Sequence, residues 1–226
     1  MAKRGKRYSE SAKLVDPGKK YELKDAVRLL KSYKPAKFNE SVEVSMKLGI
    51  DPRQSDQLMR GSISLPKGIG KSLKVVVFAT GEKAEIAKKA GADEVDAEEL
   101  VKKVEGGWTD FDVAIATSDM MKLVGKLGRV LGPQGKMPSP KSGTVTDDVE
   151  KAVKEFKAGK IEYRTDAGGN VHALVGKLTF SDEDLVENIN TFIKHIVSSR
   201  PSSAKGVFLQ NVSITTTMGP GIPLQV

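Results

Sequence analysis

Hydrophobic and polar residues follow two different periodicities in the first and last parts of the chain. Residues 23–33 place apolar side chains at helical spacing, whereas residues 41–48 alternate strictly between polar and apolar positions. Residues 171–175 alternate in the same way, and residues 207–217 are rich in β-branched side chains. Residues 181–199 predict a helix that begins with a serine suited to capping it. Both terminal parts therefore favour half-buried strands packed on helices.

The middle of the chain has a different pattern. Residues 73–80 and 111–117 are short, almost continuous apolar runs. Helical patterns occupy residues 82–90 and 97–104 between these runs, and residues 147–157 after them. Continuous apolar strands that alternate with helices are typical of a parallel sheet covered on both faces.

These patterns predict two domains of different fold class. Residues 1–67 and 160–226 together form an α+β sandwich, into which a Rossmann-like parallel α/β domain of residues 68–159 is inserted. The joints at residues 65–71 and 157–160 both contain glycine, and two adjacent connections of this kind are expected to act as a hinge.

Residues 125–145 form a segment of unusual composition, with five glycines, three prolines, four basic residues and no acidic residue. Because proline lacks a backbone donor and glycine favours turns, this segment is not expected to form one long helix. Such a backbone surrounded by cations suits contact with a polyanion. A long surface loop and a helix–loop–helix are the structural alternatives, and two Gly-x-x-Gly pairs within the segment are also compatible with an RNA-backbone clamp.

The net charge of +8 is unevenly distributed along the chain. Residues 1–67 contain sixteen Lys and Arg against eight Asp and Glu, whereas the two signs balance in residues 68–159 and in residues 160–226. An excess confined to one segment indicates a surface for a polyanion. Since no basic segment carries bulky apolar anchors, nucleic acid is favoured over a membrane.

Several other classes of site lack support in the sequence. The absence of cysteine excludes disulfides and thiolate metal sites, and no cofactor or metal is implied. His195 lies on the polar side of its predicted helix and is expected to face solvent, while His172 lies opposite Val171 and Ala173 on its strand. No Ser/His/Asp set can be selected from sequence, although distant residues could converge. We therefore predict a protein that is not an enzyme.

Residues 68–72 resemble the end of a phosphate-binding loop but lack its context. Leu65 stands where the first glycine of the pattern is required, and the motif precedes a strand instead of following one. The dinucleotide-binding pattern fails similarly, because Leu73 occupies the place of its third glycine. Nucleotide hydrolysis is therefore not predicted.

Two segments of the terminal parts offer chemistry suited to RNA. Residues 36–44 place Lys37 and Phe38 before a strand, and residues 215–221 end a strand with hydroxyls, Met218 and a Gly-Pro turn. Hydroxyls and exposed backbone suit riboses and phosphates, and Phe or Met can rest on a sugar or base. With only 5% aromatic residues, recognition of RNA shape is favoured over extensive base stacking.

The segment MMKLVGKLGRVLGPQGKMPSPKSGTV closely resembles the signature of the ribosomal protein L one family. Five further segments resemble the family in the same order and spacing, namely AKFNESVEV, LGIDPRQSDQLMRGSISLPKG, GADE, EYRTDAGGNVHALVGK and KGVFLQNVSITTTMGP. The similarity extends from Arg7 to about Pro220, and Ser139 departs from the usual Asn.

The resemblance implies a structural protein of the large ribosomal subunit, located in the cytoplasmic ribosome. It implies that the outer domain binds large-subunit (23S) rRNA at the mobile stalk, that the stalk assists release of exit-site tRNA, and that the protein represses its own operon mRNA. We also expect a monomer when free, with no membrane association. Carried onto this chain, the implied RNA contacts are Lys37, Phe38, Glu40, Asn211, Thr217, Met218 and Gly219, with Arg53, Arg60, Arg164 and His172 at the rim.

Two alternatives from other classes remain open at this point. One is an α/β enzyme that binds a nucleotide or phosphate ligand in the inner domain, with residues 125–145 closing over it. The other is a non-ribosomal RNA chaperone that uses the same basic surface without preference for ribosomal RNA.

Overall fold

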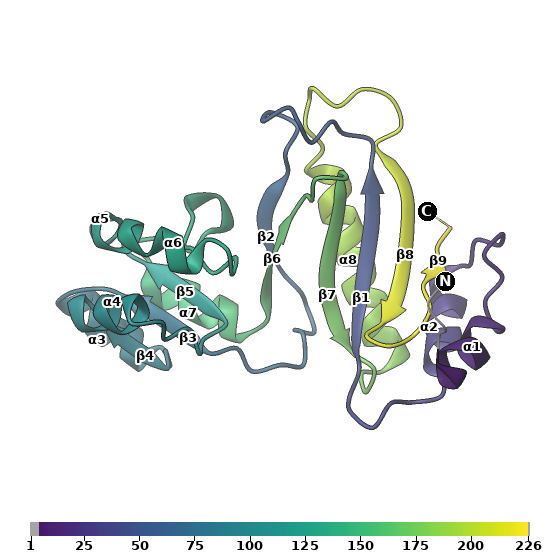
Figure 1. The fold of residues 1–226 in the computed structure, drawn as a ribbon, viewed down its shortest axis with the longest axis horizontal. Helices are drawn as coiled ribbons and strands as arrows, with labels where there is room; N and C mark the ends of the chain where they lie inside the picture. Colours follow the sequence, from purple (N-terminus) through teal and green to yellow (C-terminus); the bar gives the residue numbers. More distant parts are fainter. Residues whose placement is uncertain (1–4, 226) are drawn as a thin grey trace. The chain divides into compact units, whose positions relative to one another are not determined.

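The computed structural model describes residues 5–225, which divide into two compact units (Figure 1). The outer unit combines residues 5–70 with residues 161–225, and the inner unit is Lys71–Lys160. The inner unit is therefore an insertion within the sequence of the outer unit.

The outer unit is built on a four-stranded antiparallel sheet with the order β7-β1-β8-β9. Its strands are β1 (Ser41–Leu48), β7 (Asn170–Lys177), β8 (Leu209–Thr216) and β9 (Ile222–Pro223). Strand β1 lies between two strands from the C-terminal part of the chain, so that Val42 pairs with both Gly176 and Thr216. Residues from both ends of the chain are thus required to complete this sheet.

Strand β1 buries alternate side chains, as its sequence predicts. Val42, Val44, Met46 and Leu48 are each at most 1% exposed, whereas the polar side chains between them are half-buried or exposed. A strand with one apolar and one polar face packs on one side only. The prediction of this strand and of its two faces is confirmed.

Two helices cover the apolar face of the sheet, α2 (Leu23–Lys31) against β8 and α8 (Asp182–Ser198) against β7 (Figure 1). Helix α8 begins as predicted, because the Ser181 hydroxyl accepts a hydrogen bond of 3.1 Å from the Asp184 N–H. Its stripe of Leu185, Ile189, Phe192 and Ile196 is fully buried. The apolar face of this sheet and the two helices form the core of the outer unit.

Four elements of the outer unit were not predicted. They are α1 (Lys6–Ala12), β2 (Arg60–Ser64), β6 (Lys160–Arg164) and the two-residue strand β9, of which β2 and β6 form a separate two-stranded sheet. Tyr163 of β6 packs edge-on against Phe192 of α8, with ring centroids 6.0 Å apart. Each of these elements is seven residues long at most, too short to give a clear periodicity.

The inner unit contains a parallel sheet with the order β4-β3-β5. Its strands are β3 (Val75–Phe78), β4 (Glu94–Asp96) and β5 (Val113–Ala116), and its main helices are α3 (Glu82–Lys89), α4 (Glu98–Glu105) and α7 (Val149–Lys157). All four side chains of β3 are buried, as expected of a strand that is covered on both faces. The predicted mixture of a parallel α/β unit and an antiparallel α+β unit is confirmed.

The glycine-rich segment of residues 125–145 is packed into the inner unit. Its first turns, η1 (Gly125–Leu127) and α6 (Gly128–Leu131), follow directly on α5 (Met121–Val124), and η2 (Pro140–Ser142) comes after a non-helical stretch of residues 132–139. Leu127 and Leu131 are fully buried in a cluster with Val76 and Phe78. The segment is therefore not one long helix, as predicted, and of the two alternatives its short helical turns on either side of a partly exposed loop fit the helix–loop–helix.

Candidate nucleic-acid interface

One face of the four-stranded sheet is lined with polar side chains, and we call it the polar face. On it, Ser45 pairs with His172 of β7 and Ser213 of β8, and Lys47 pairs with Asn211. Within residues 5–225, helices α2 and α8 cover only the opposite face (Figure 1). Rows of hydroxyl, amide, imidazole and ammonium groups can donate hydrogen bonds to phosphates and riboses.

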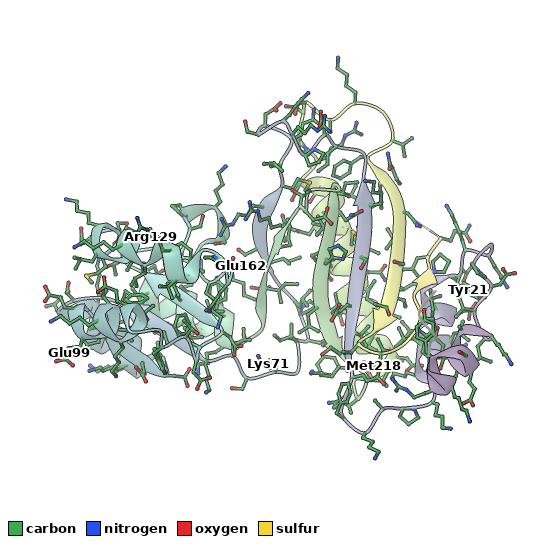
Figure 2. The ribbon with its side chains drawn as sticks, viewed as in Figure 1. Tyr21, Lys71, Glu99, Arg129, Glu162 and Met218 are labelled. Carbon is green, nitrogen blue, oxygen red and sulfur yellow. The ribbon has the colours of Figure 1, made fainter. Side chains whose placement is uncertain are left out.

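One end of the polar face carries the predicted contacts of the loop before β1 and of the turn after β8. Phe38 and Met218 are 53% and 51% exposed, which is high for large apolar side chains. Met218 is labelled in Figure 2. The loop and the turn are joined by backbone, since the Thr217 N–H donates to the Ser41 carbonyl at 3.0 Å. We name this arrangement the loop–turn site, and its members are Lys37, Phe38, Thr217, Met218 and Gly219.

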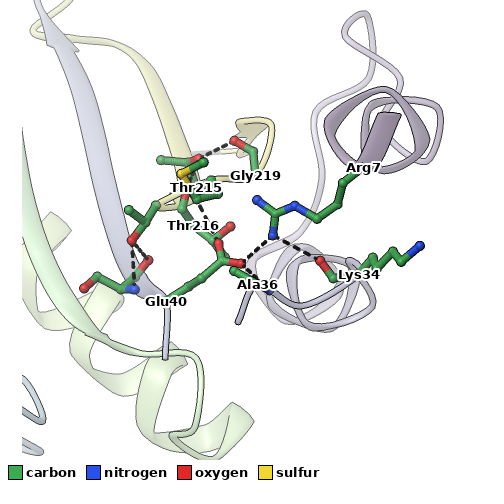
Figure 3. Close-up of polar contacts among 10 residues, drawn as sticks. Arg7, Lys34, Ala36, Glu40, Thr215, Thr216 and Gly219 are labelled. Carbon is green, nitrogen blue, oxygen red and sulfur yellow. Dashed lines mark hydrogen bonds and ion pairs between the residues drawn. The ribbon is translucent and has the colours of Figure 1, made fainter. Parts of the chain in front are cut away.

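Glu40 lies beneath the loop–turn site instead of on its surface. Its residue is 3% exposed, and its carboxylate accepts hydrogen bonds from the Ala36 N–H at 3.0 Å, the Met218 N–H at 3.1 Å and Arg7 at 3.1 Å (Figure 3). The carboxylate is thus engaged by the protein and is not presented to solvent. The resemblance implies that Glu40 contacts RNA. In the structure its side chain instead binds the backbone of the loop and of the turn and so connects the two parts of the site.

The environment of Glu40 keeps its carboxylate charged. Burial alone would raise its pKa, but hydrogen bonds from Thr216, from the Met218 and Ala36 amides and from Arg7 lower the pKa below its ordinary value. A charged acceptor forms stronger hydrogen bonds to backbone donors than a neutral one. The loop and the turn are therefore connected through a buried negative charge.

The predicted rim residues lie at the other end of the polar face, where β1 ends and β7 begins. Arg53 and Arg164 are exposed, and Arg60 Nη2 lies 3.9 Å from Glu162 Oε2. Asn211 belongs to this end as well, because it pairs with Lys47 and not with the start of β1. Six residues of β1 separate the two ends, a span of roughly 20 Å at the usual rise of a strand.

A serine, a histidine and an aspartate converge on the polar face, which the sequence could not specify. Ser45 Oγ lies 3.0 Å from His172 Nδ1, and His172 Nε2 lies 3.5 Å from Asp166 Oδ2. The His172 and Asp166 side chains are 57% and 42% exposed, so water reaches both of them. Because exposed hydroxyl, imidazole and carboxylate groups can hydrogen-bond phosphates and riboses, we interpret this set as polar contact groups.

Asp166 is the acidic member of this set, and its carboxylate is hydrogen-bonded within the turn before β7. Its carboxylate accepts hydrogen bonds from the Asn170 side chain and backbone and from the Gly168 N–H. These bonds, Asn170 first, lower the pKa of Asp166 to about 2. The carboxylate thus shapes the turn before β7, and it remains ionised wherever RNA binding is measured.

His195 does not face solvent as the sequence predicted. It is half-buried, and its Nε2 lies 3.0 Å from the hydroxyl of Tyr163 on β6. Burial lowers the pKa of His195 below its ordinary value. The prediction was wrong because β6, the strand that covers this part of α8, was not recognised.

The inner unit presents cations of its own from the segment around residues 125–145. Lys122, Lys126, Arg129 and Lys141 are all exposed there (Figure 2 labels Arg129). The first Gly-x-x-Gly pair, Gly125 and Gly128, lies in helical turns with a buried Leu127, whereas the second pair, Gly132 and Gly135, forms an exposed turn after α6. Among residues 5–225, no group of His, Asp and Glu side chains is arranged to hold a metal, and no helix is long and apolar enough to cross a bilayer.

An inserted parallel α/β unit, together with an α+β unit whose polar sheet face is flanked by cations, defines a two-unit protein suited to RNA. Comparison with family models gives a match to the ribosomal protein L1p/L10e family over residues 30–220. Since the match covers most of the chain, the protein belongs to this family.

Membership of the family establishes the general role of the chain. It is a structural protein of the ribosome that binds rRNA, in a family that is not enzymatic, and it is part of the cytoplasmic ribosome. The matched region includes both the loop–turn site and the segment of residues 125–145. It begins after α1, so that Arg7 lies outside it.

Proposed function

We propose that the polar face and the loop–turn site of the outer unit bind a folded segment of large-subunit (23S) rRNA at the mobile stalk. The observation that carries this proposal is the pair of half-exposed apolar side chains, Phe38 and Met218, beside a row of hydroxyl and amide groups. Apolar surfaces can rest on a base or ribose while the polar groups contact phosphates and 2′-hydroxyls.

Charge supports the same surface. The excess of cations in residues 1–67 belongs to the outer unit, and Lys37, Lys47 and Arg53 are exposed around its polar face. Each phosphate that is neutralised contributes about 0.7–0.9 to the slope of log affinity against log salt. In this proposal the polar face of the sheet recognises the shape of the folded RNA, and the cations around it increase the affinity through contacts with phosphates.

Footprinting on total ribosomal RNA tests the proposal directly. Purified protein is expected to protect one compact region of the large-subunit RNA, and poly(U) in excess should not abolish the protection. Uniform weak protection that poly(U) removes would instead indicate a general RNA chaperone. Tight stoichiometric binding of nucleotides in equilibrium dialysis, without RNA protection, would favour a ligand-binding role of the inner unit.

Two finer roles are proposed from the resemblance to the family. One is assistance of exit-site tRNA release as the stalk moves, and the other is repression of the protein's own operon mRNA, with the free protein acting as a monomer. If the messenger presents the same RNA shape, it binds the same polar face, and the two RNAs must compete. Translation of a reporter behind the operon leader should fall when the protein is added and recover when the protected rRNA fragment is added. A reporter that is insensitive to the protein would exclude repression.

A further inference from the structure

We propose that Arg7 of helix α1, acting through Glu40, is a positioning residue for RNA binding. It sets the loop that carries Phe38 relative to the turn that carries Met218. The inference rests on the proposed RNA-binding function of the loop–turn site. It goes beyond that function because it makes the N-terminal helix, which lies outside the region matched by the family, part of the recognition apparatus.

Three segments that are far apart in the sequence meet at the Glu40 carboxylate. Oε1 accepts from the Ala36 N–H at 3.0 Å and from Arg7 Nη1 at 3.1 Å, and Oε2 accepts from the Met218 N–H at 3.1 Å (Figure 3). Arg7 Nη1 also lies 3.5 Å from the carbonyl of Lys34. The carboxylate therefore links helix α1, the loop before β1 and the turn after β8.

The burial of the two charges determines how Arg7 acts. The side chain of Glu40 is 4% exposed and that of Arg7 is 28% exposed. Among residues 5–225, Glu40 is the one buried residue with a charged side chain. Loss of its cationic partner Arg7 is therefore expected to cost more free energy than loss of a partner in a surface ion pair. Removing one partner of a buried pair leaves an uncompensated charge, which the surrounding segments must move to solvate.

Arg7 is not expected to contact RNA itself, since its guanidinium points toward Glu40 (Figure 3). A cation that contacts phosphate changes the salt dependence of binding when it is removed. A positioning cation changes affinity but leaves the salt dependence as it was. This difference separates the two roles experimentally.

The test uses Arg7→Met in the full chain, with Lys6→Met as the matched control. Lys6 lies next to Arg7 on helix α1, is exposed, and loses the same charge on substitution. Affinity is measured for the rRNA fragment that the wild-type protein protects, over a series of salt concentrations. Arg7→Met is expected to weaken binding on the order of tenfold, within the range seen for side chains coupled in one hydrogen-bond network, with an unchanged salt slope. Lys6→Met should change affinity little.

A double-mutant cycle identifies the partner through which Arg7 acts. Glu40→Gln keeps the shape of the side chain but gives it an amide donor that faces backbone N–H groups, so it should also weaken binding. If Arg7 acts through Glu40, the double variant binds about as well as Glu40→Gln alone. Additive losses would show that Arg7 acts independently of Glu40. Arg7→Lys should restore part of the lost affinity, because it restores the charge.

Amide hydrogen exchange in the free protein gives a readout that does not depend on RNA. The Ala36 and Met218 amides, which donate to Glu40, should exchange faster in Arg7→Met, whereas the Val44 amide in the middle of β1 should be unaffected. Unchanged exchange at both amides, or wild-type affinity of a folded variant, would overturn the inference. If the wild-type protein itself fails to bind the RNA while the exchange differs as expected, the proposed function fails and the structural coupling stands.

Discussion

The ring of Tyr33 lies directly against Gly219, the glycine of the loop–turn site. A Cβ atom added at Gly219 would lie 3.0 Å from Tyr33 Cδ2 and 2.4 Å from Thr216 Oγ1. Tyr33 is 6% exposed, and burial raises the pKa of its hydroxyl, which therefore stays protonated. The Thr216 hydroxyl, the nearer of the two, and the Tyr33 ring together leave no room for a Cβ atom at Gly219 in this turn.

Gly219→Ala is accordingly expected to displace the turn. Overpacking of this kind should lower the free energy of unfolding by about 1–3 kcal/mol and weaken rRNA binding, because Met218 moves with the turn. Gly221→Ala is the control, since a Cβ atom there has no neighbour within 4 Å. Urea unfolding and fragment binding measure the two effects. Equal behaviour of the two variants would show that Tyr33 does not constrain the turn.

Removal of the exposed apolar side chains tests the contact surface itself. Phe38→Ala and Met218→Ala should each weaken binding of the protected rRNA fragment, with a loss of about 1–3 kcal/mol expected for an aromatic ring that stacks on a base. Neither change should alter the salt slope, because no charge is removed. Leu14→Ala removes a comparably exposed side chain, 51% exposed, from another part of the outer unit and should leave affinity unchanged. A folded variant with undiminished affinity would remove that residue from the site.

Asn188 is expected to be essential for the stability of the outer unit. It is fully buried in α8, and its side chain donates to the Gly68 and Val175 carbonyls at 2.9 and 2.8 Å and accepts from the Lys67 N–H at 3.1 Å. Asn188→Ala removes the side-chain partner of the buried Val175 carbonyl and of two part-buried backbone groups, and should cost about 3 kcal/mol of unfolding free energy.

The exposed Asn190 on the same helix provides the control for this change. Asn190→Ala should have little effect in the same denaturation experiment. If both substitutions were equally mild, the segment of residues 67–68 would not depend on its contacts with α8.

The lowered pKa of the half-buried His195 allows a prediction of how the free energy of unfolding depends on pH. Burial lowers its pKa in the folded state, so the unfolded chain binds the proton more readily. Its contribution to stability is complete above the unfolded pKa of about 6.5 and is lost as pH falls through the lower folded pKa. The free energy of unfolding should therefore decline between pH 7.5 and pH 5, and His195→Gln should reduce this decline. Asn190→Ala, an exposed substitution without a titratable group on the same helix, is the control and should leave the decline unchanged.

The outer unit should bind RNA without the inner unit. Replacing Lys71–Lys160 by a short Gly-Ser linker between residues 70 and 161 retains the polar face and the loop–turn site. The shortened protein is expected to protect the same rRNA region with similar affinity. Specific binding that survives only in the isolated inner unit would contradict our placement of the interface.

Much of the fold could be predicted because individual elements have strong local patterns. The alternation of β1 and the serine cap of α8 each specify an element without reference to the rest of the chain. Strand β6 gives no comparable signal. It has only Ile161 and Tyr163 as apolar positions within five residues. Because this strand was not predicted, His195 was expected to face solvent instead of the Tyr163 hydroxyl.

The candidate site could be predicted only in part, for a different reason. Phe38 and Met218 could be selected from residue type and from resemblance to a family. The pairing of Ser45 with His172 and Ser213 depends on strand order and register, which are properties of the assembled sheet. The ion pair of Arg7 and Glu40 joins a helix without a clear pattern to a loop, so nothing local indicates it.

The placement of β1 between β7 and β8 has a consequence for synthesis of the chain. Neither partner strand exists when β1 leaves the ribosomal exit tunnel, since the first residue of β7 follows the end of β1 by roughly 120 residues, about 6–25 s at ordinary rates of translation. The inserted unit, whose sequence is continuous, can fold during this delay. A nascent chain must therefore protect an unpaired apolar strand until its last residues have emerged, and its solubility during that interval depends on what shields β1.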